Sequence, residues 1–187
     1  MSEIHTILDH LMEEGTAATV HFHTWWALRN LAIPQFYETM NDLSHVDFFH
    51  ASNSGHYKLF FLALSKIFDR DSRVSGISHL RETLRQNGYP KLADELETKL
   101  VPLRSAVSRV MSIRNRTIVH NERELSREKI YDLNGITPNE IRQLINSTCD
   151  AIDSVADGIG LSNRISSGER HERATLAMLK SLQKGMA

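Results

Sequence analysis

Apolar residues recur at helical spacing along nearly the whole chain, and the strict alternation typical of strands is almost absent. The clearest stripe consists of Tyr57, Phe60, Phe61, Leu64 and Phe68, at positions i, i+3, i+4, i+7 and i+11. It predicts a core helix over about 54–69. The same spacing predicts further helices over about 2–14, 16–33, 35–43, 78–86 and 90–121, one opening at 137–140, and a last one containing Leu176, Leu179 and Leu182.

Glycine, proline and capping residues set the expected ends of these helices. Gly15 and Pro34 are expected to terminate the first two helices, because glycine favours helix ends and an interior proline removes a backbone hydrogen bond. Pro102 is expected to kink the helix over 90–121. The tetrapeptide at 137–140 supplies a threonine N-cap, a first-turn proline and a capping-box glutamate.

These elements predict an all-α fold, an antiparallel helical bundle. At 187 residues the chain is expected to form a single domain, with a core over about 15–160. Residues 161–187 are expected to form a linker and an amphipathic helix, and the apolar face of that helix is a candidate arm for a dimer.

Composition narrows the function classes. Hydrophobic residues make up 41% and charged residues 24%, as in an ordinary globular protein. The net charge of −1 excludes a polybasic protein held on nucleic acid by bulk charge. However, residues 1–50 carry one arginine against seven acids, whereas residues 104–129 carry seven basic groups against three acids. The positive charge is therefore concentrated in one stretch.

The apolar runs and the cysteine count bear on location. Cys149 is the only cysteine, which excludes an internal disulfide framework and a cysteine zinc cluster and suits a reducing compartment. The first residues show no signal-peptide pattern, and no apolar run approaches the roughly 20 residues of a membrane span. We expect a cytoplasmic protein that does not enter a membrane.

The basic stretch contains the motif that carries chemistry, Arg114-Asn115-Arg116-Thr117-Ile118-Val119-His120. Five residues separate Arg114 from His120, and asparagine follows the arginine directly. Two other arginine–histidine pairs, Arg73/His79 and Arg164/His171, have similar spacing but lack a polar residue after the arginine. The pair Arg114/His120 is therefore the specific one.

This motif resembles the signature of the HEPN superfamily, small helical bundles of prokaryotic defence and toxin systems. An aromatic-rich helix ending at Phe68-Asp69-Arg70, a short helix, and a long helix ending in the motif resemble the abortive-infection branch, the Abi-U type, over about 15–160. The resemblance implies an endoribonuclease active in phage defence or as a toxin. It also implies a homodimer with the two motifs facing each other, and a possible antitoxin or defence-system partner.

RNA cleavage by such a motif follows simple chemistry. RNA carries its own nucleophile, the 2′-hydroxyl beside the scissile phosphate. Histidine can transfer protons near neutral pH, and the arginine fork matches two phosphate oxygens. We expect His120 to act as general base or acid, Arg114 to clamp the phosphate, and Asn115 and Arg116 to bind substrate. Asp69 is a supporting candidate. The route requires neither a metal nor a cofactor.

The spacing leaves one geometric question open. On an ideal α-helix, positions six residues apart lie roughly 120° around the axis and about 9 Å along it, so Arg114 and His120 would not form a close pair. Either the helix end is distorted or a second subunit completes the site. A symmetric interface would place two copies of each residue in one cleft.

Structural roles for the same residues remain open. Arg114 falls on the stripe formed by Val107, Val110, Met111 and Ile118 and would then pair with an acid such as Asp69. His120 would then cap a helix C-terminus. In that case the protein would be a non-catalytic HEPN-like module that binds RNA, nucleotide or a partner protein.

The remaining histidines give weaker evidence for a functional site. His21-Phe22-His23 places two rings on different sides of a helix, which makes a poor chelate. Asp42-x-x-His45 and Asp47-x-x-His50 space a carboxylate and an imidazole as in some bundle metal sites, although no Glu-x-x-His occurs. A bundle metalloprotein is thus a third, weaker hypothesis. Glu122 stands where one HEPN subclass has a tyrosine that is adenylylated, which argues against that toxin–antitoxin pairing.

Overall fold

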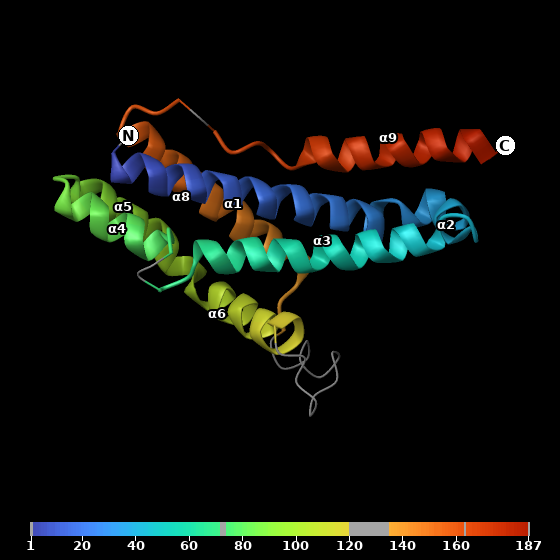
Figure 1. The fold of residues 1–187 in the computed structure, drawn as a ribbon, viewed down its shortest axis with the longest axis horizontal. Coiled ribbons are helices and arrows are strands. Elements are labelled where there is room, and N and C mark those ends of the chain that lie inside the picture. The colour runs from blue at the N-terminus through green and yellow to red at the C-terminus, as the bar shows by residue number, and fades with distance from the viewer. Residues whose placement is uncertain (1, 72–73, 120–134, 163, 187) are drawn as a thin grey trace. The chain divides into compact units, whose positions relative to one another are not determined.

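The computed structural model describes residues 2–71, 74–119, 135–162 and 164–186. Helices account for all the regular structure in these ranges, as Figure 1 shows, so the predicted all-α fold is confirmed. The α-helices are α1 (Glu3–Trp26), α2 (Ile33–Asn41), α3 (Val46–Ile67), α4 (Ile77–Gln86), α5 (Pro90–Leu100), α6 (Arg104–Ile113), α8 (Pro138–Gly158) and α9 (Glu169–Met186). Three shorter turns link them: η1 (Ala27–Leu31), η2 (Val101–Leu103) and η3 (Arg114–Val119).

The first of two compact units contains Met1–Ala18 and Phe61–Ile165. Within it α5 packs against α4 and α8, and α6 packs against α8. Its interior is filled by aliphatic side chains and one aromatic ring. The fully enclosed ones include Ile7, Leu8, Leu11, Phe61, Leu64, Ile67, Leu80, Leu84, Leu96 and Ile113.

Gly15 does not end a helix, contrary to the expectation from sequence. It lies inside α1, which continues to Trp26. A Cβ atom at this position would lie 2.7 Å from the Cδ1 atom of Ile165 and 3.4 Å from the Sγ atom of Cys149. The thiol of Cys149 is buried, with its Sγ atom 3.8 Å from the Gly15 carbonyl oxygen. The glycine therefore serves close packing rather than helix termination.

The second compact unit contains Thr19–Phe60 and Ser166–Ala187. Here α9 packs against η1 and α2, and Leu179 is fully buried in a cluster with Leu28, Ala32, Phe36, Met40 and Phe49. Leu176 and Leu182 pack on the same cluster. The apolar face of α9 is thus covered by its own chain, so the expectation that it is free to act as a dimer arm is wrong.

An aromatic cluster joins α1 and α3 within this second unit. Phe22 and Trp25 on α1 contact Phe60 on α3, with ring centroids 5.6 Å apart in both pairs. Tyr57 stacks at an angle on Trp25 with a centroid distance of 5.9 Å. Helix α3 begins at Val46, about eight residues earlier than the sequence predicts, because Phe49 in its first turns is buried in the core.

His23 is a buried histidine in this unit that is paired with an acid. Its Nδ1 atom lies 2.6 Å from Oε1 of Glu172, at the start of α9. A Cβ atom at Gly168 would come within 1.9–2.4 Å of the His23 ring. The close approach of the chain before α9 to this ring therefore requires glycine.

Over the same described ranges, no helix combines the length and the apolar character that a membrane crossing requires.

Candidate functional site

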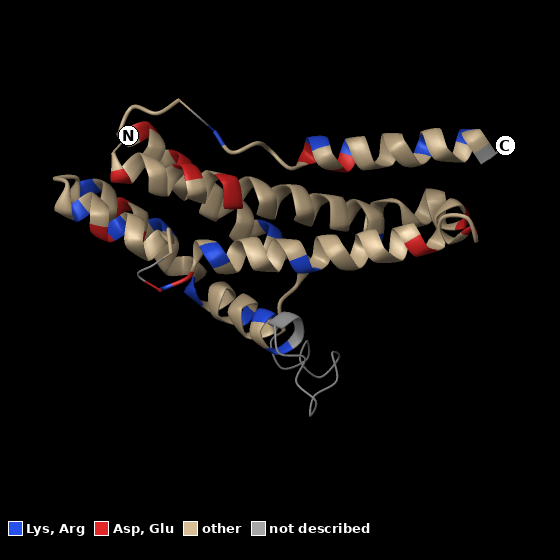
Figure 2. Ribbon diagram, in the orientation of Figure 1, with Lys and Arg blue, Asp and Glu red and all other residues tan. Residues whose placement is uncertain are grey.

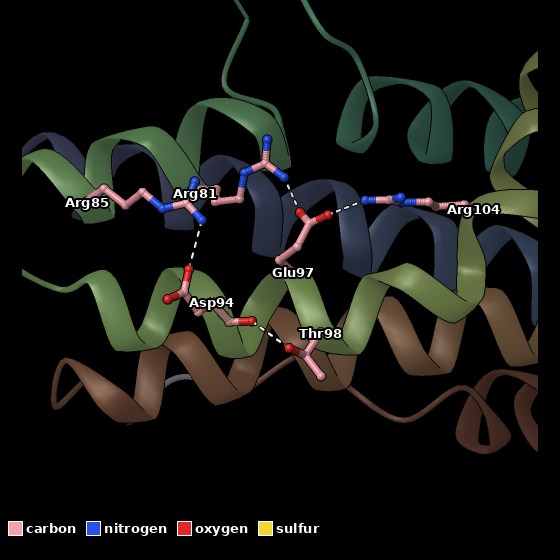
Figure 3. A network of polar contacts seen from close by, with 6 residues as sticks. All are labelled: Arg81, Arg85, Asp94, Glu97, Thr98 and Arg104. Carbon is pink, nitrogen blue, oxygen red and sulfur yellow. Dashed lines mark hydrogen bonds and ion pairs between the residues drawn. The ribbon is translucent and has the colours of Figure 1, made fainter.

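Helix α6, which leads into the motif, is fixed at its first residue by a polar network with α4 and α5 (Figure 3). Glu97 on α5 accepts hydrogen bonds from Arg81 on α4 and from Arg104 at the start of α6. Burial acts to raise the pKa of Glu97, but the two guanidinium groups outweigh it and hold that pKa below its ordinary value. Arg85 and Asp94 form a second α4–α5 pair at 2.8 Å. The network sets the start of α6 relative to its neighbours.

The end of α6 changes helix type where the motif begins. Val110 and Ile113 are buried and hold the last turn of α6 in the core. From Arg114 to Val119 the backbone is a π-helix. A π-helical turn is wider than an α-helical one and is found frequently at functional sites. The spacing of Arg114 and His120 left two explanations open, a distorted helix end or a second subunit. The first of these, a distorted helix end, is present.

Arg114 is half-buried at the junction of α6 and η3. Its Nη1 atom donates to Oδ1 of Asn115 at 2.6 Å, and Asn115 itself is exposed. The Nε atom of Arg114 is enclosed and has no hydrogen-bond acceptor among the described residues. The asparagine directly after the arginine therefore orients the guanidinium group from the same chain.

Arg116 follows two residues later and is also half-buried. Neither it nor Arg114 forms an ion pair with a described carboxylate, unlike most arginines on neighbouring helices. Figure 2 shows basic positions near the end of α6. The arginines of the same unit that pair with a described carboxylate include Arg81, Arg85, Arg104, Arg109 and Arg164. Arg114 and Arg116 therefore have no acidic partner among the described residues.

Arg109 lies on α6 before the motif and bonds to two residues that follow the motif in the chain. The sequence did not indicate this role. The Nη1 atom of Arg109 donates to the carbonyl oxygen of Gly135 at 2.7 Å, and its Nη2 atom donates to Oε1 of Glu140 at 2.8 Å. The predicted capping box is present, with Thr137 donating through its N–H to Oε2 of Glu140 at 2.8 Å. That bond, with the Arg109 guanidinium, lowers the pKa of Glu140 to about 2.

Asp69 does not pair with Arg114. Its Oδ1 atom accepts the backbone N–H of Asp71 at 3.0 Å, and its carbonyl oxygen lies where a Cβ atom at Gly76 would come within 2.5 Å. Asp69 therefore closes the turn after α3. The suggested ion pair with Arg114 does not form among the described residues, and the supporting role stays a prediction.

His120 lies outside the described residues, as do Asn121 and Glu122. The backbone of η3 ends at Val119, immediately before it. The structure thus places Arg114, Asn115 and Arg116 at one helix end, and the described backbone stops one residue before His120. The assignment of catalytic roles to Arg114 and His120 stays a prediction.

Two of the other histidines contact each other, a pairing that the sequence did not indicate. His21 and His56 lie with their Nδ1 atoms 2.9 Å apart, and burial lowers the pKa of each ring. His21 and His23 thus serve different contacts, as their spacing predicts. Asp42 accepts the backbone N–H of Ser44 at 2.8 Å, and its Oδ1 atom lies 3.7 Å from Nδ1 of His45, the partner that the sequence spacing indicates. Within the part of the chain that the structure describes, no three or more His, Cys, Asp or Glu side chains are grouped as metal ligands.

Comparison with known proteins identifies one family. The model of the family HEPN_AbiU2, described as AbiU2, matches residues 1–174. No curated protein and no solved structure gives a significant match. The family match covers nearly the whole chain, including α6, η3 and α8. The chain therefore belongs to the AbiU2 family of HEPN proteins, and it is a HEPN-like module of the abortive-infection type.

Proposed function

We propose that this protein is an endoribonuclease of the HEPN type that cleaves RNA through attack of the 2′-hydroxyl. The observation that carries the proposal is the π-helical end of α6, where Arg114 and Arg116 lie without described carboxylate partners immediately before His120. Membership in the AbiU2 family supports the same function. The role is defence by abortive infection or a related toxin-like action in the cytoplasm.

The proposed reaction divides the work among three groups. A base removes the proton from the 2′-hydroxyl, and the 2′-oxygen attacks the phosphorus. The 5′-oxygen leaves with a proton from an acid, which gives a 2′,3′-cyclic phosphate and a 5′-hydroxyl end. His120 supplies the base or the acid. Arg114 holds two phosphate oxygens through its planar fork and stabilises the charge that develops in the transition state.

Asn115 and Arg116 have supporting roles in this proposal. The bond from Arg114 Nη1 to Asn115 Oδ1 uses one of the four Nη donors and leaves the other Nη donors for phosphate, while Nε is enclosed. A guanidinium group that is oriented before substrate arrives loses less rotational freedom on binding. Arg116 supplies a second positive charge to the RNA backbone.

The test is RNA cleavage in EDTA, with product ends identified by mass. Wild type is expected to leave 2′,3′-cyclic phosphate ends and to spare a strand in which every 2′-hydroxyl is replaced by hydrogen. His120→Ala and Arg114→Ala are each expected to lower kcat about 100-fold or more. The matched control is Arg173→Ala, which removes an exposed arginine from α9, outside the motif and its supporting network. RNA bound but not cleaved by wild type would favour the non-catalytic module instead.

The proposed homodimer has its own test. If the site takes Arg114 from one subunit and His120 from the other, mixing the two inactive variants creates mixed dimers with one intact pair. Their mixture is then expected to regain a substantial part of the wild-type activity. A mixture as inactive as its components would show that each site is complete within one chain.

A further inference from the structure

A second π-helical turn lies in the other compact unit and carries the same dipeptide as the motif. The segment η1 links α1 to α2 and contains Arg29-Asn30. The N–H of Ala32 bonds to the carbonyl oxygen of Ala27 at 2.8 Å, the i to i+5 pattern of a π-turn. Ala27 and Leu28 are buried, whereas Arg29 and Asn30 are exposed. The wide turn thus presents an arginine outward while the core side stays packed.

A hollow of about 150 Å³ lies beside this turn. Residues from η1, α2 and α3 line it, all within the second unit. Its floor is apolar, formed by Leu28, Met40 and Phe49, each less than 9% exposed. The remaining lining residues are Arg29, Ile33, Tyr37, Asn41, His50 and Asn53. None of these lining residues is acidic, so the hollow presents positive charge over an apolar base.

Two polar groups at the hollow have no described partner. Arg29 forms neither an ion pair nor a hydrogen bond with any residue that the structure describes. The Oδ1 atom of Asn53 is enclosed and accepts no hydrogen bond. A buried acceptor without a donor costs free energy, which a ligand that carries an N–H group recovers.

An aromatic side chain completes the set. Tyr37, which lines the hollow, is 61% exposed. An exposed tyrosine is a platform on which a planar ring can stack. The ligand that uses all three features has an anionic group for Arg29, a flat ring for Tyr37 and the apolar floor, and an N–H donor for Asn53. A nucleotide has these three parts.

We propose that this hollow binds one nucleotide of single-stranded RNA, with its phosphate on Arg29, its base on Tyr37 and a base N–H donating to Asn53. The inference rests on the proposed function for the identity of the ligand, RNA, and it adds a contact made by residues outside the motif. Stacking tolerates every base, whereas the single amide favours bases that present a donor. The site holds RNA and takes no part in the bond-breaking steps.

The experiment measures binding of a short fluorescent RNA whose 2′-hydroxyls are all methylated, so that cleavage cannot occur. Fluorescence anisotropy over a range of salt gives Kd and its salt dependence. Arg29→Ala is expected to weaken binding and to reduce the slope of log K against log salt by about 0.7, the loss of one phosphate contact to a single strand. Tyr37→Ala is expected to weaken binding about fivefold or more, whereas Tyr37→Phe keeps the ring and binds like wild type.

The matched control is Lys58→Ala, which removes an exposed positive charge from α3 in the same unit but outside the hollow. Unchanged binding by both Arg29→Ala and Tyr37→Ala would overturn this inference, while cleavage of ordinary RNA by the same variants would leave the proposed function intact. Loss of cleavage in His120→Ala bears only on the proposed function. A free nucleoside monophosphate that displaces the RNA at equal concentration would also overturn the assignment to RNA.

Discussion

Leu179 on α9 offers a quantitative test of how the second unit is held together. Its side chain is fully buried against five core residues of the same unit. Leu179→Ala removes three carbon atoms from this cluster and leaves a cavity that the surrounding helices fill only in part. Substitutions of this kind cost about 2–5 kcal/mol of unfolding free energy. For a chain of this size, that corresponds to a fall in Tm of roughly 5–20 °C.

The assay is urea unfolding followed by tryptophan fluorescence. Trp25 and Trp26 are the only two tryptophans in the sequence, and both belong to the second unit, so the signal reports on that unit. Met178→Ala is the matched control on the same helix, because Met178 is 44% exposed. We expect this control to change stability by no more than about 1 kcal/mol.

Equal effects of the two substitutions would refute the packing argument. The same is true of a Leu179→Ala effect below about 1 kcal/mol. A loss of stability in Leu179→Ala that disappears at high protein concentration would place α9 between copies of the chain instead.

Three further predictions concern the polar contacts. Arg109→Ala removes the bonds from α6 to Gly135 and Glu140 and should lower kcat for RNA cleavage by about 10- to 100-fold, because small displacements of reacting groups are costly. Arg109→Lys should not restore kcat, since lysine lacks the fork that reaches both acceptors. The pKa of Glu140 is lowered to about 2 from 4.5. Its contribution to stability is therefore full above pH 4.5 and is lost as the pH falls through 2. Glu140→Gln should flatten the fall in Tm over that range. The lowered pKa values of His21 and His56 favour their neutral forms in the folded protein. Stability should therefore decline as the pH falls below 6.5. In thermal melting, the double variant His21→Gln/His56→Gln should lose the part of this decline that the two rings cause.

The helix content of the fold was predictable because it depends on local periodicity. The stripe from Tyr57 to Phe68 needs no knowledge of its neighbours to be read as helical, and the capping box at Thr137 is a local pattern that the structure confirms. The errors occurred where a residue acts over distance. Gly15 serves a contact with Ile165, which lies 150 positions later in the chain. No local pattern indicates such a contact.

The site divides in the same way. The order of Arg114, Asn115 and Arg116 is visible in the sequence, and the bond between the first two follows from their adjacency. The π-helical backbone of η3 is not visible, because a change of hydrogen-bond pattern leaves the spacing of apolar residues nearly the same. Arg109 was missed for the same reason as Gly15, since its acceptors, Gly135 and Glu140, lie 26 and 31 positions later in the chain.

The buried thiol of Cys149 can report on local opening of the first unit through its rate of chemical labelling. The chain has no other cysteine, and this Sγ atom is packed near the carbonyl oxygen of Gly15 on α1. Because Cys149 is only 8% exposed, we expect a thiol reagent to react mainly when this part of the first unit opens. The rate of labelling at low denaturant reports the free energy of that local opening. It does so independently of the two tryptophans, which report on the other unit.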